Sequence, residues 1–117
     1  MKKLLKEQPT KITFGNYTLN VKIRGDIDHH SAKGVREMID EAIMSNKPRF
    51  IVLDLSSVDF MDSSGLGLIL GRYTCASNIG ARLILYKPTR RIKRILEMAG
   101  IERIIEIKGD DENEMFR

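Results

Sequence analysis

The order of apolar patterns along the chain constrains its fold more than any other feature. From residue 31 onward, segments with apolar side chains three or four positions apart, typical of helices, alternate with short apolar runs typical of strands. This alternation predicts right-handed crossovers between parallel strands, and a length of 117 residues suits one domain. We therefore expect a single α/β domain over residues 1–117, with a mostly parallel sheet flanked by helices.

Two short alternating segments precede this pattern. Residues 11–14 and 17–24 alternate between apolar and polar side chains, and Gly15 and Asn16 between them suit a tight turn. These features predict a β-hairpin. In its second strand, the side chains expected to face the core are Leu19, Val21 and Ile23.

Further strands and helices complete the expected order ββαβαβαβα. Residues 50–55 are almost continuously apolar, which is typical of a strand covered on both faces. The last two strands are expected over residues 81–86 and 104–107. Helices are expected over residues 31–45, 63–78, 89–100 and 110–116. In the third of these, Thr89 is the expected cap and Gly100 the expected end. The side chains predicted to face inward from the first three helices are Ala32, Val35, Ile39, Ala42, Ile43, Leu66, Ile69, Leu70, Tyr73, Ile92, Ile95, Leu96 and Ala99.

The loops that follow the parallel strands are expected to meet at one edge of the sheet. Residues 25–30 are too polar and turn-prone to extend the strand before them, and residues 56–63 and 87–89 follow the next two strands. In open sheets of this kind, the loops at the carboxyl ends of the strands usually form the binding site. Residues far apart in the sequence should therefore come together there.

The charge of the chain is small and unevenly distributed. The net charge is +4, yet residues 1–25 and 63–108 are net positive, while residues 26–62 and 109–117 are net negative. Such opposing blocks favour polarised surfaces for protein contacts at least as much as a phosphate-binding face. The basic run at residues 82–94 is read as a solvated helix face, or else as a site for an acidic partner. We expect no direct nucleic-acid partner.

Cysteine usage and hydropathy point to a cytoplasmic protein. Cys75 is the single cysteine, so an internal disulfide or a Cys-rich zinc site is excluded, as is usual in a reducing compartment. No secretory signal follows the basic N-terminus, and no apolar stretch approaches the length of a membrane span. We expect no membrane partner and a monomer when the protein is free.

Residue spacing disfavours three functional interpretations: a nucleotide-binding site, a metal site and a hydrolytic serine. The glycines in residues 65–71 miss the G-x-G-x-x-G nucleotide pattern, and a tight helix entry with close helix–sheet approach explains them better. His29 and His30 have no second cluster that would complete a metal shell. Ser63 does not lie in a G-x-S-x-G motif. We expect no metal, no cofactor, no catalytic residue and no enzyme activity.

Ser63 allows two interpretations, because it lies where a helix is expected to begin. Its hydroxyl is either an N-cap or a group in the first turn, and a cap would contribute about 1 kcal/mol. Alternatively, Ser63 is a phosphorylation site. A phosphate is tolerated at a helix N-terminus, and Asp28, Asp59 and Asp62 already make this edge acidic. Phosphorylation would then switch docking rather than folding.

Two segments resemble the anti-sigma factor antagonists of the bacterial STAS-domain family. Residues 25–30 read G-D-I-D-H-H, close to the G-E-L-D-H-H of that family, and residues 60–73 read F-M-D-S-S-G-L-G-L-I-L-G-R-Y, nearly identical to its phosphorylation-site segment. Matches at residues 93–94 and 98–101 extend the resemblance at consistent spacing. It implies a single STAS domain. Its motif favours the sporulation type of antagonist, and stress-response antagonists carry similar motifs.

The resemblance also implies a mechanism of partner switching. The phosphorylated serine corresponds to Ser63, and the partner-binding residues correspond to Asp26, Asp28, His29, Asp62, Ser63, Ser64 and Gly65. The unphosphorylated protein would bind an anti-sigma factor that is itself a serine kinase and so release the sigma factor. Phosphorylation would end this interaction, and a PP2C-type phosphatase would reset it. The alternative is a STAS adaptor or ligand-sensing module that is not phosphorylated, in which Ser63 is only a cap.

Overall fold

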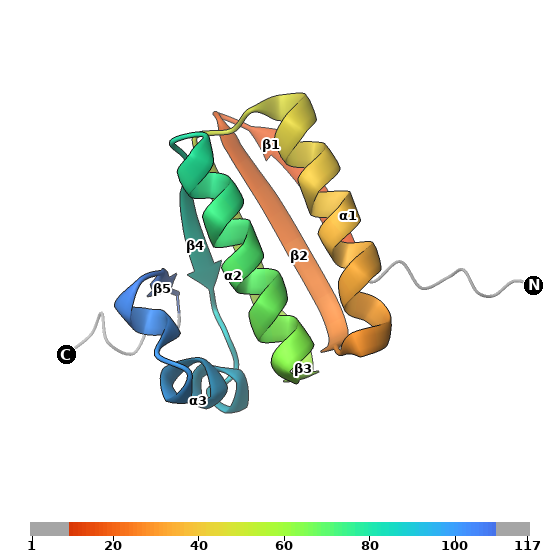
Figure 1. Cartoon of the computed structure of the whole chain (residues 1–117), viewed down its shortest axis with the longest axis vertical. Coiled ribbons are helices and arrows are strands. Elements are labelled where there is room, and N and C mark those ends of the chain that lie inside the picture. The colour runs from red at the N-terminus through yellow and green to blue at the C-terminus, as the bar shows by residue number, and fades with distance from the viewer. Residues whose placement is uncertain (1–9, 110–117) are drawn as a thin grey trace, which may run out of the picture.

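The computed structural model describes residues 10–109, which form a five-stranded sheet and three α-helices (Figure 1). The strands are β1 (Thr10–Gly15), β2 (Thr18–Ile27), β3 (Phe50–Met61), β4 (Arg82–Tyr86) and β5 (Glu106–Lys108). The helices are α1 (His29–Asn46), α2 (Ser63–Asn78) and α3 (Arg90–Met98), followed by the 3-10 helix η2 (Ile101–Arg103). Apart from η2, the expected order is confirmed up to β5. The helix predicted over residues 110–116 lies outside the described residues.

The β-hairpin is confirmed, with its turn one residue later than expected. β1 ends at Gly15, and the turn residues are Asn16 and Tyr17, with φ angles of +53° and +63°. A two-residue type I′ turn requires two such positive values. The Tyr17 carbonyl accepts hydrogen bonds from the N–H groups of Arg49 (2.8 Å) and Phe50 (3.1 Å), and the Arg49 guanidinium lies 4.7 Å from the Tyr17 ring centroid. These contacts hold the turn against the start of β3.

The strand order explains why the crossover helices cover one face of the sheet. The strands lie in chain order, with β1 antiparallel to β2 and all other neighbours parallel. Successive right-handed crossovers therefore step in the same direction, which places their helices on the same face. α1 and α2 lie side by side across it (Figure 1).

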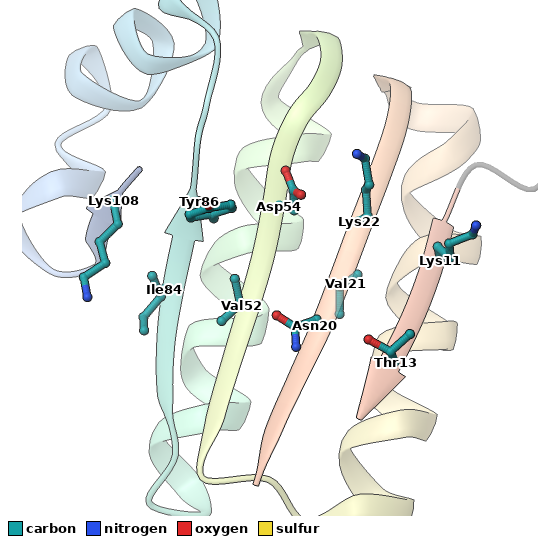
Figure 2. A pocket seen from close by; sticks show the side chains of 10 residues that line it. All are labelled: Lys11, Thr13, Asn20, Val21, Lys22, Val52, Asp54, Ile84, Tyr86 and Lys108. Carbon is teal, nitrogen blue, oxygen red and sulfur yellow. The ribbon is translucent and has the colours of Figure 1, made fainter. Parts of the chain in front are cut away.

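The opposite face of the sheet is open in the described part of the chain. The expectation that β3 is covered on both faces is therefore wrong. Leu53 and Leu55 are fully buried under the helices, whereas Val52 and Asp54 are half-buried on the open face. Figure 2 shows this face, with the helices behind the sheet.

The inward faces of the helices are confirmed for α1 and partly wrong for α2 and α3. Val35, Ile39 and Ile43 of α1 are buried as expected. In α2, Leu70 is 40% exposed, and the buried positions are Gly65, Leu68, Ile69, Arg72 and Ala76. Ile69 is buried as expected, and Leu66 and Tyr73 are partly buried against the core. Because a glycine and an arginine also occupy inward positions of α2, a search for apolar spacing finds only part of its buried face. In α3, Ile92 and Leu96 are buried as expected, but Ala99 is exposed.

β2 and β3 continue further than expected, into segments that were predicted as loops. β2 runs to Ile27 and β3 to Met61, and both of these side chains are buried. The polar side chains that precede Ile27 and Met61 are directed away from the core. They therefore do not interrupt the pairing of the two strands. The register shifts twice, between Lys22 and Arg24 and between Gly25 and Asp26, and each time β3 has one more residue than β2. Gly25, at the second shift, has a φ of +82°. α1 correspondingly begins at His29 rather than at residue 31.

Candidate functional site

The carboxyl ends of β2 and β3 lie side by side and place two helix N-termini at one edge. Asp26 pairs with Phe60 and Ile27 with Met61 in parallel register, and the Asp62 N–H donates to the Ile27 carbonyl (3.3 Å). α1 and α2 start at this edge, at the lower end of the sheet in Figure 1. The structure therefore brings together all the site residues predicted from the sequence: Asp26, Asp28, His29, Asp62, Ser63, Ser64 and Gly65.

Asp28 is the N-cap of α1. Its Oδ1 accepts hydrogen bonds from the N–H groups of His30 (2.9 Å) and Ser31 (3.0 Å). The Ser31 hydroxyl accepts from the Asp28 N–H (3.1 Å) and donates to the Asp26 carbonyl (2.9 Å). The hydrogen bond from the Ser31 N–H is the main cause that lowers the pKa of Asp28. Asp28 is therefore a fixed carboxylate at this edge.

Asp62, and not Ser63, is the N-cap of α2. The Asp62 Oδ1 accepts from the Ser64 N–H at 2.8 Å, and its backbone carbonyl accepts from Gly65 at 2.9 Å. Ser63 is the first residue of α2 and is exposed. Of the two positions predicted for Ser63, the one in the first turn is thus correct. Since Asp62 is the residue that caps α2, Ser63 does not have the role of N-cap.

Gly65 sets how closely α2 approaches the sheet. A Cβ atom at this position would lie 2.7 Å from the Met61 Cγ and 3.2 Å from the Ile27 carbonyl oxygen. The predicted close approach is therefore confirmed at Gly65. At Gly67 and Gly71 it is wrong, because a Cβ there would meet no atom within 4 Å. Gly65 is buried, so it offers little surface of its own at this edge.

The edge is acidic, with histidines on one side and a basic helix at the same end of the molecule. Asp26 is exposed and Asp28 and Asp62 are half-buried. His29 and His30 are exposed, with ring centroids 5.8 Å apart. α3 also begins at this end (Figure 1), where the Thr89 hydroxyl accepts from the Ile92 N–H (3.2 Å), which confirms the predicted cap.

Sequence reasoning missed one apolar side chain at this edge. Phe60 is 42% exposed and lies on β3 opposite Asp26. Exposed aromatic side chains are typical anchor residues of protein interfaces. Beyond Leu55 the buried positions of β3 are Val58 and Met61, three residues apart, so a simple alternation in the sequence could not have placed Phe60.

The described residues contain neither a metal cluster nor a membrane span. Over residues 10–109, no group of three or more His, Cys, Asp or Glu side chains is arranged to hold a metal ion. In the same range, no helix is both long and apolar enough to cross a membrane.

The family is decided by a match over almost the whole chain. The model of the STAS domain matches residues 8–113. The chain belongs to the STAS-domain family. Its STAS relatives include the anti-sigma F factor antagonist of Paenibacillus polymyxa, 39% identical over 95 residues that cover 81% of each protein. The anti-sigma-B factor antagonist of Listeria monocytogenes is 32% identical over 91 residues, covering 78% of this chain and 79% of the relative.

Solved STAS structures agree with the fold. The anti-sigma factor antagonist SpoIIAA in its unphosphorylated form is 25% identical, with a TM-score of 0.69, and the match covers 92% of this chain and 94% of SpoIIAA. SpoIIAA from Bacillus in the phosphorylated form gives a TM-score of 0.68, with 25% identity and coverage of 92% and 99%. The relatives of this STAS domain are thus regulatory antagonists of anti-sigma factors.

Proposed function

We propose that this protein is an anti-sigma factor antagonist controlled by phosphorylation of Ser63. The unphosphorylated form binds an anti-sigma factor that is also a serine kinase, and this binding releases the sigma factor in the cytoplasm. The kinase transfers the γ-phosphoryl group of ATP to the Ser63 Oγ, with ADP as leaving group and the hydroxyl proton passing to the kinase. A PP2C-type phosphatase hydrolyses the phosphoserine. The protein is then the substrate of these enzymes and not an enzyme itself.

The exposed Ser63 hydroxyl, not used as a cap, is the observation that carries this proposal. It lies at the N-terminus of α2, where the helix dipole favours negative charge, so a phosphate leaves the fold intact. The names of the relatives supply the anti-sigma factor, and SpoIIAA, determined in a phosphorylated form, supports a phosphorylated state.

Electrostatics and hydration explain how one phosphate would end docking. The phosphate adds roughly two negative charges beside the carboxylate of Asp62. In an interface that fits a hydroxyl, these charges lose their hydration, and the repulsion from neighbouring carboxylates adds to that loss. We expect affinity to fall about a hundredfold or more, since like-charge contacts cost several kcal/mol.

The first test is phosphorylation by the cognate kinase. The protein is incubated with the anti-sigma factor and ATP, and the modified residue is located by mass spectrometry. We expect one phosphate on Ser63, its absence in Ser63→Ala, and normal modification of the matched control Ser64→Ala. A wild-type protein that carries no phosphate on Ser63 would refute the proposal.

The second test separates charge from size. Ser63→Asp should lose binding to the anti-sigma factor, while Ser63→Ala should bind constitutively, with unchanged circular dichroism in both. Ser63→Asn has the size of aspartate without its charge and should bind much more tightly than Ser63→Asp. If Ser63→Asp binds as tightly as the wild type, charge is not the switch.

A pocket on the open face of the sheet favours a ligand-sensing module as the second candidate. It has a volume of about 490 Å³, within the usual range for small ligands, and its lining includes Val52, Ile84 and Tyr86 (Figure 2). A sensor would be stabilised thermally by its ligand and would remain unmodified after incubation with the kinase. That result would replace the first proposal with the second.

A further inference from the structure

A groove between α1 and α2 adjoins the predicted docking edge. Its volume is about 590 Å³. The lining residues that matter here are Lys33, Arg36, Ser64, Gly67, Gly71 and Arg72. Ser64 belongs both to this groove and to the docking edge beside Ser63, so the two surfaces are continuous.

Two glycines in the wall of this groove are not explained by the packing of the protein itself. Gly67 and Gly71 lie four residues apart in α2, and a Cβ at either would meet no atom within 4 Å. Glycine in a helix interior is less stable than alanine, so the fold alone would favour a larger residue at both positions. Bare backbone in the wall lets another chain approach α2 closely.

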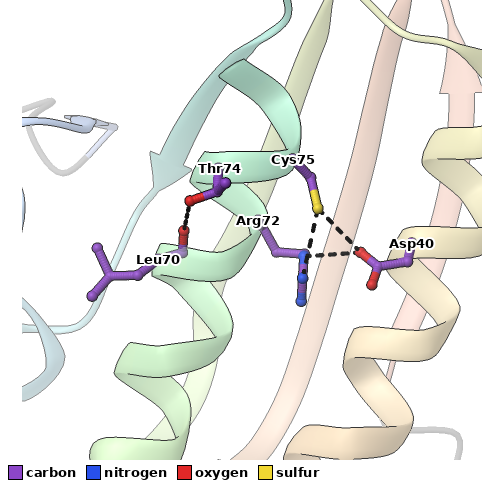
Figure 3. A network of polar contacts seen from close by, with 5 residues as sticks. All are labelled: Asp40, Leu70, Arg72, Thr74 and Cys75. Atoms are coloured by element: carbon purple, nitrogen blue, oxygen red, sulfur yellow. Dashed lines mark hydrogen bonds and ion pairs between the residues drawn. The ribbon is translucent and has the colours of Figure 1, made fainter. Parts of the chain in front are cut away.

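A buried arginine in the same groove lacks a full set of partners. Arg72 is 5% exposed and reaches from α2 toward α1 (Figure 3). Its Nε lies 2.9 Å from the Asp40 Oδ1, an ion pair whose geometry falls short of a hydrogen bond. Its Nη2 makes a long contact of 3.8 Å to the Cys75 Sγ, and among the described residues its Nη1 has no hydrogen-bond partner. A buried N–H without an acceptor is unfavourable, and a carboxylate is the natural acceptor for a guanidinium.

The rim of the groove is positive. Lys33 and Arg36 are exposed on α1, while Arg72 is buried in the wall and paired through its Nε with Asp40. No acidic residue is among the described residues that line the groove. Its charge therefore matches a negatively charged chain. We propose that the α1–α2 groove binds an acidic segment of the anti-sigma factor, with a carboxylate of that segment paired to the Arg72 guanidinium. The identity of the partner rests on the proposed function above.

The decisive experiment fills the groove without disturbing the core. Gly67→Leu and Gly71→Leu are compared with the matched control Gly34→Leu, since Gly34 is also a helical glycine with nothing within 4 Å but does not line the groove. Binding of the purified anti-sigma factor is measured by calorimetry and stability by thermal unfolding. We expect all three variants to unfold no earlier than the wild type. The two groove variants should bind at least tenfold more weakly, with Gly34→Leu unchanged.

Charge reversal provides a second measurement that does not depend on the glycines. Lys33→Glu and Arg36→Glu should weaken binding, and the loss should shrink as the salt concentration rises. If Gly71→Leu binds like the wild type while Ser63→Asp does not bind, the groove proposal is overturned and the proposed function stands. If the leucine variants instead change the self-association of the isolated protein, the occupant is a second copy and the groove proposal is overturned as well. If the Ser63→Asp variant also binds the anti-sigma factor as tightly as the wild type, the proposed function itself is contradicted.

Discussion

Replacement of Gly65 by alanine tests how tightly α2 is joined to the sheet. The added Cβ would lie 2.7 Å from the Met61 Cγ, 3.0 Å from the Met61 Cβ and 3.2 Å from the Ile27 carbonyl oxygen. The Met61 Cβ is bonded directly to the backbone, and the Ile27 carbonyl oxygen is part of it. Neither atom can therefore rotate away from the new Cβ. The Ile27 carbonyl also accepts the Asp62 N–H, so moving it disturbs the cap of α2.

The magnitude follows from two opposing effects. Adding a methyl group to a filled interior typically costs about 1–3 kcal/mol, while replacing a helical glycine by alanine contributes up to about 1 kcal/mol. With the full offset, the net loss for Gly65→Ala is up to about 2 kcal/mol. In a domain of this size, 1 kcal/mol changes Tm by about 4 °C, so Tm should fall by up to about 8 °C. Gly67→Ala has free space around its new Cβ and should instead gain up to about 1 kcal/mol.

Urea unfolding of the two alanine variants provides the assay. The midpoint should decrease for Gly65→Ala and increase for Gly67→Ala, with equal m values, because neither change alters the surface exposed on unfolding. A Gly65→Ala variant as stable as Gly67→Ala would refute the argument, since the close approach at Met61 would then place no constraint on α2.

Three further predictions follow from the polar contacts. Asp62→Ala removes the N-cap of α2 and should cost about 0.5–2 kcal/mol, with a smaller loss for Asp62→Asn, both measured by urea unfolding. Because the pKa of Asp28 is below its ordinary 3.8, its contribution to stability is present above that pH and is lost as pH falls through the lowered pKa. Asp28→Asn should flatten the acid limb of the stability profile, and an NMR titration of the carboxyl should give the lowered pKa directly. Asp40→Ala leaves the guanidinium of Arg72 buried without its anion and should cost about 3 kcal/mol, more than Arg72→Met, because Asp40 is 37% exposed and water can solvate it.

Most of the element order could be predicted from the sequence, because it depends on local pattern. The alternation of helix and strand patterns after residue 31 and the hairpin pattern at residues 11–24 were sufficient to predict this order. The ends of β2 and β3 could not be predicted in this way. Polar residues such as Asp26 look like loop residues in isolation, and only pairing with a neighbouring strand keeps them extended.

The candidate site was predictable in position, whereas the groove beside it was not. Both segments that carry the site follow strands, so their meeting at one edge follows from parallel topology. The inward face of α2 includes Gly65 and Arg72, which no hydrophobic pattern selects. Sequence alone gives Gly65, Gly67 and Gly71 the same appearance, and only the packed structure separates the glycine that the sheet requires from the two that nothing in the protein requires.

The position of Ser63 relative to this packing explains how its charge could change without a change in fold. Asp62 caps α2 and Gly65 begins its contact with the sheet, so Ser63 lies between these two supports and contributes to neither. A phosphate there would extend into solvent next to a favourable helix terminus. Under the proposed function, stability and docking would therefore depend on different residues of one turn. Gly65→Ala should lower stability, and Ser63→Asp should weaken docking while leaving Tm within the range of a surface substitution.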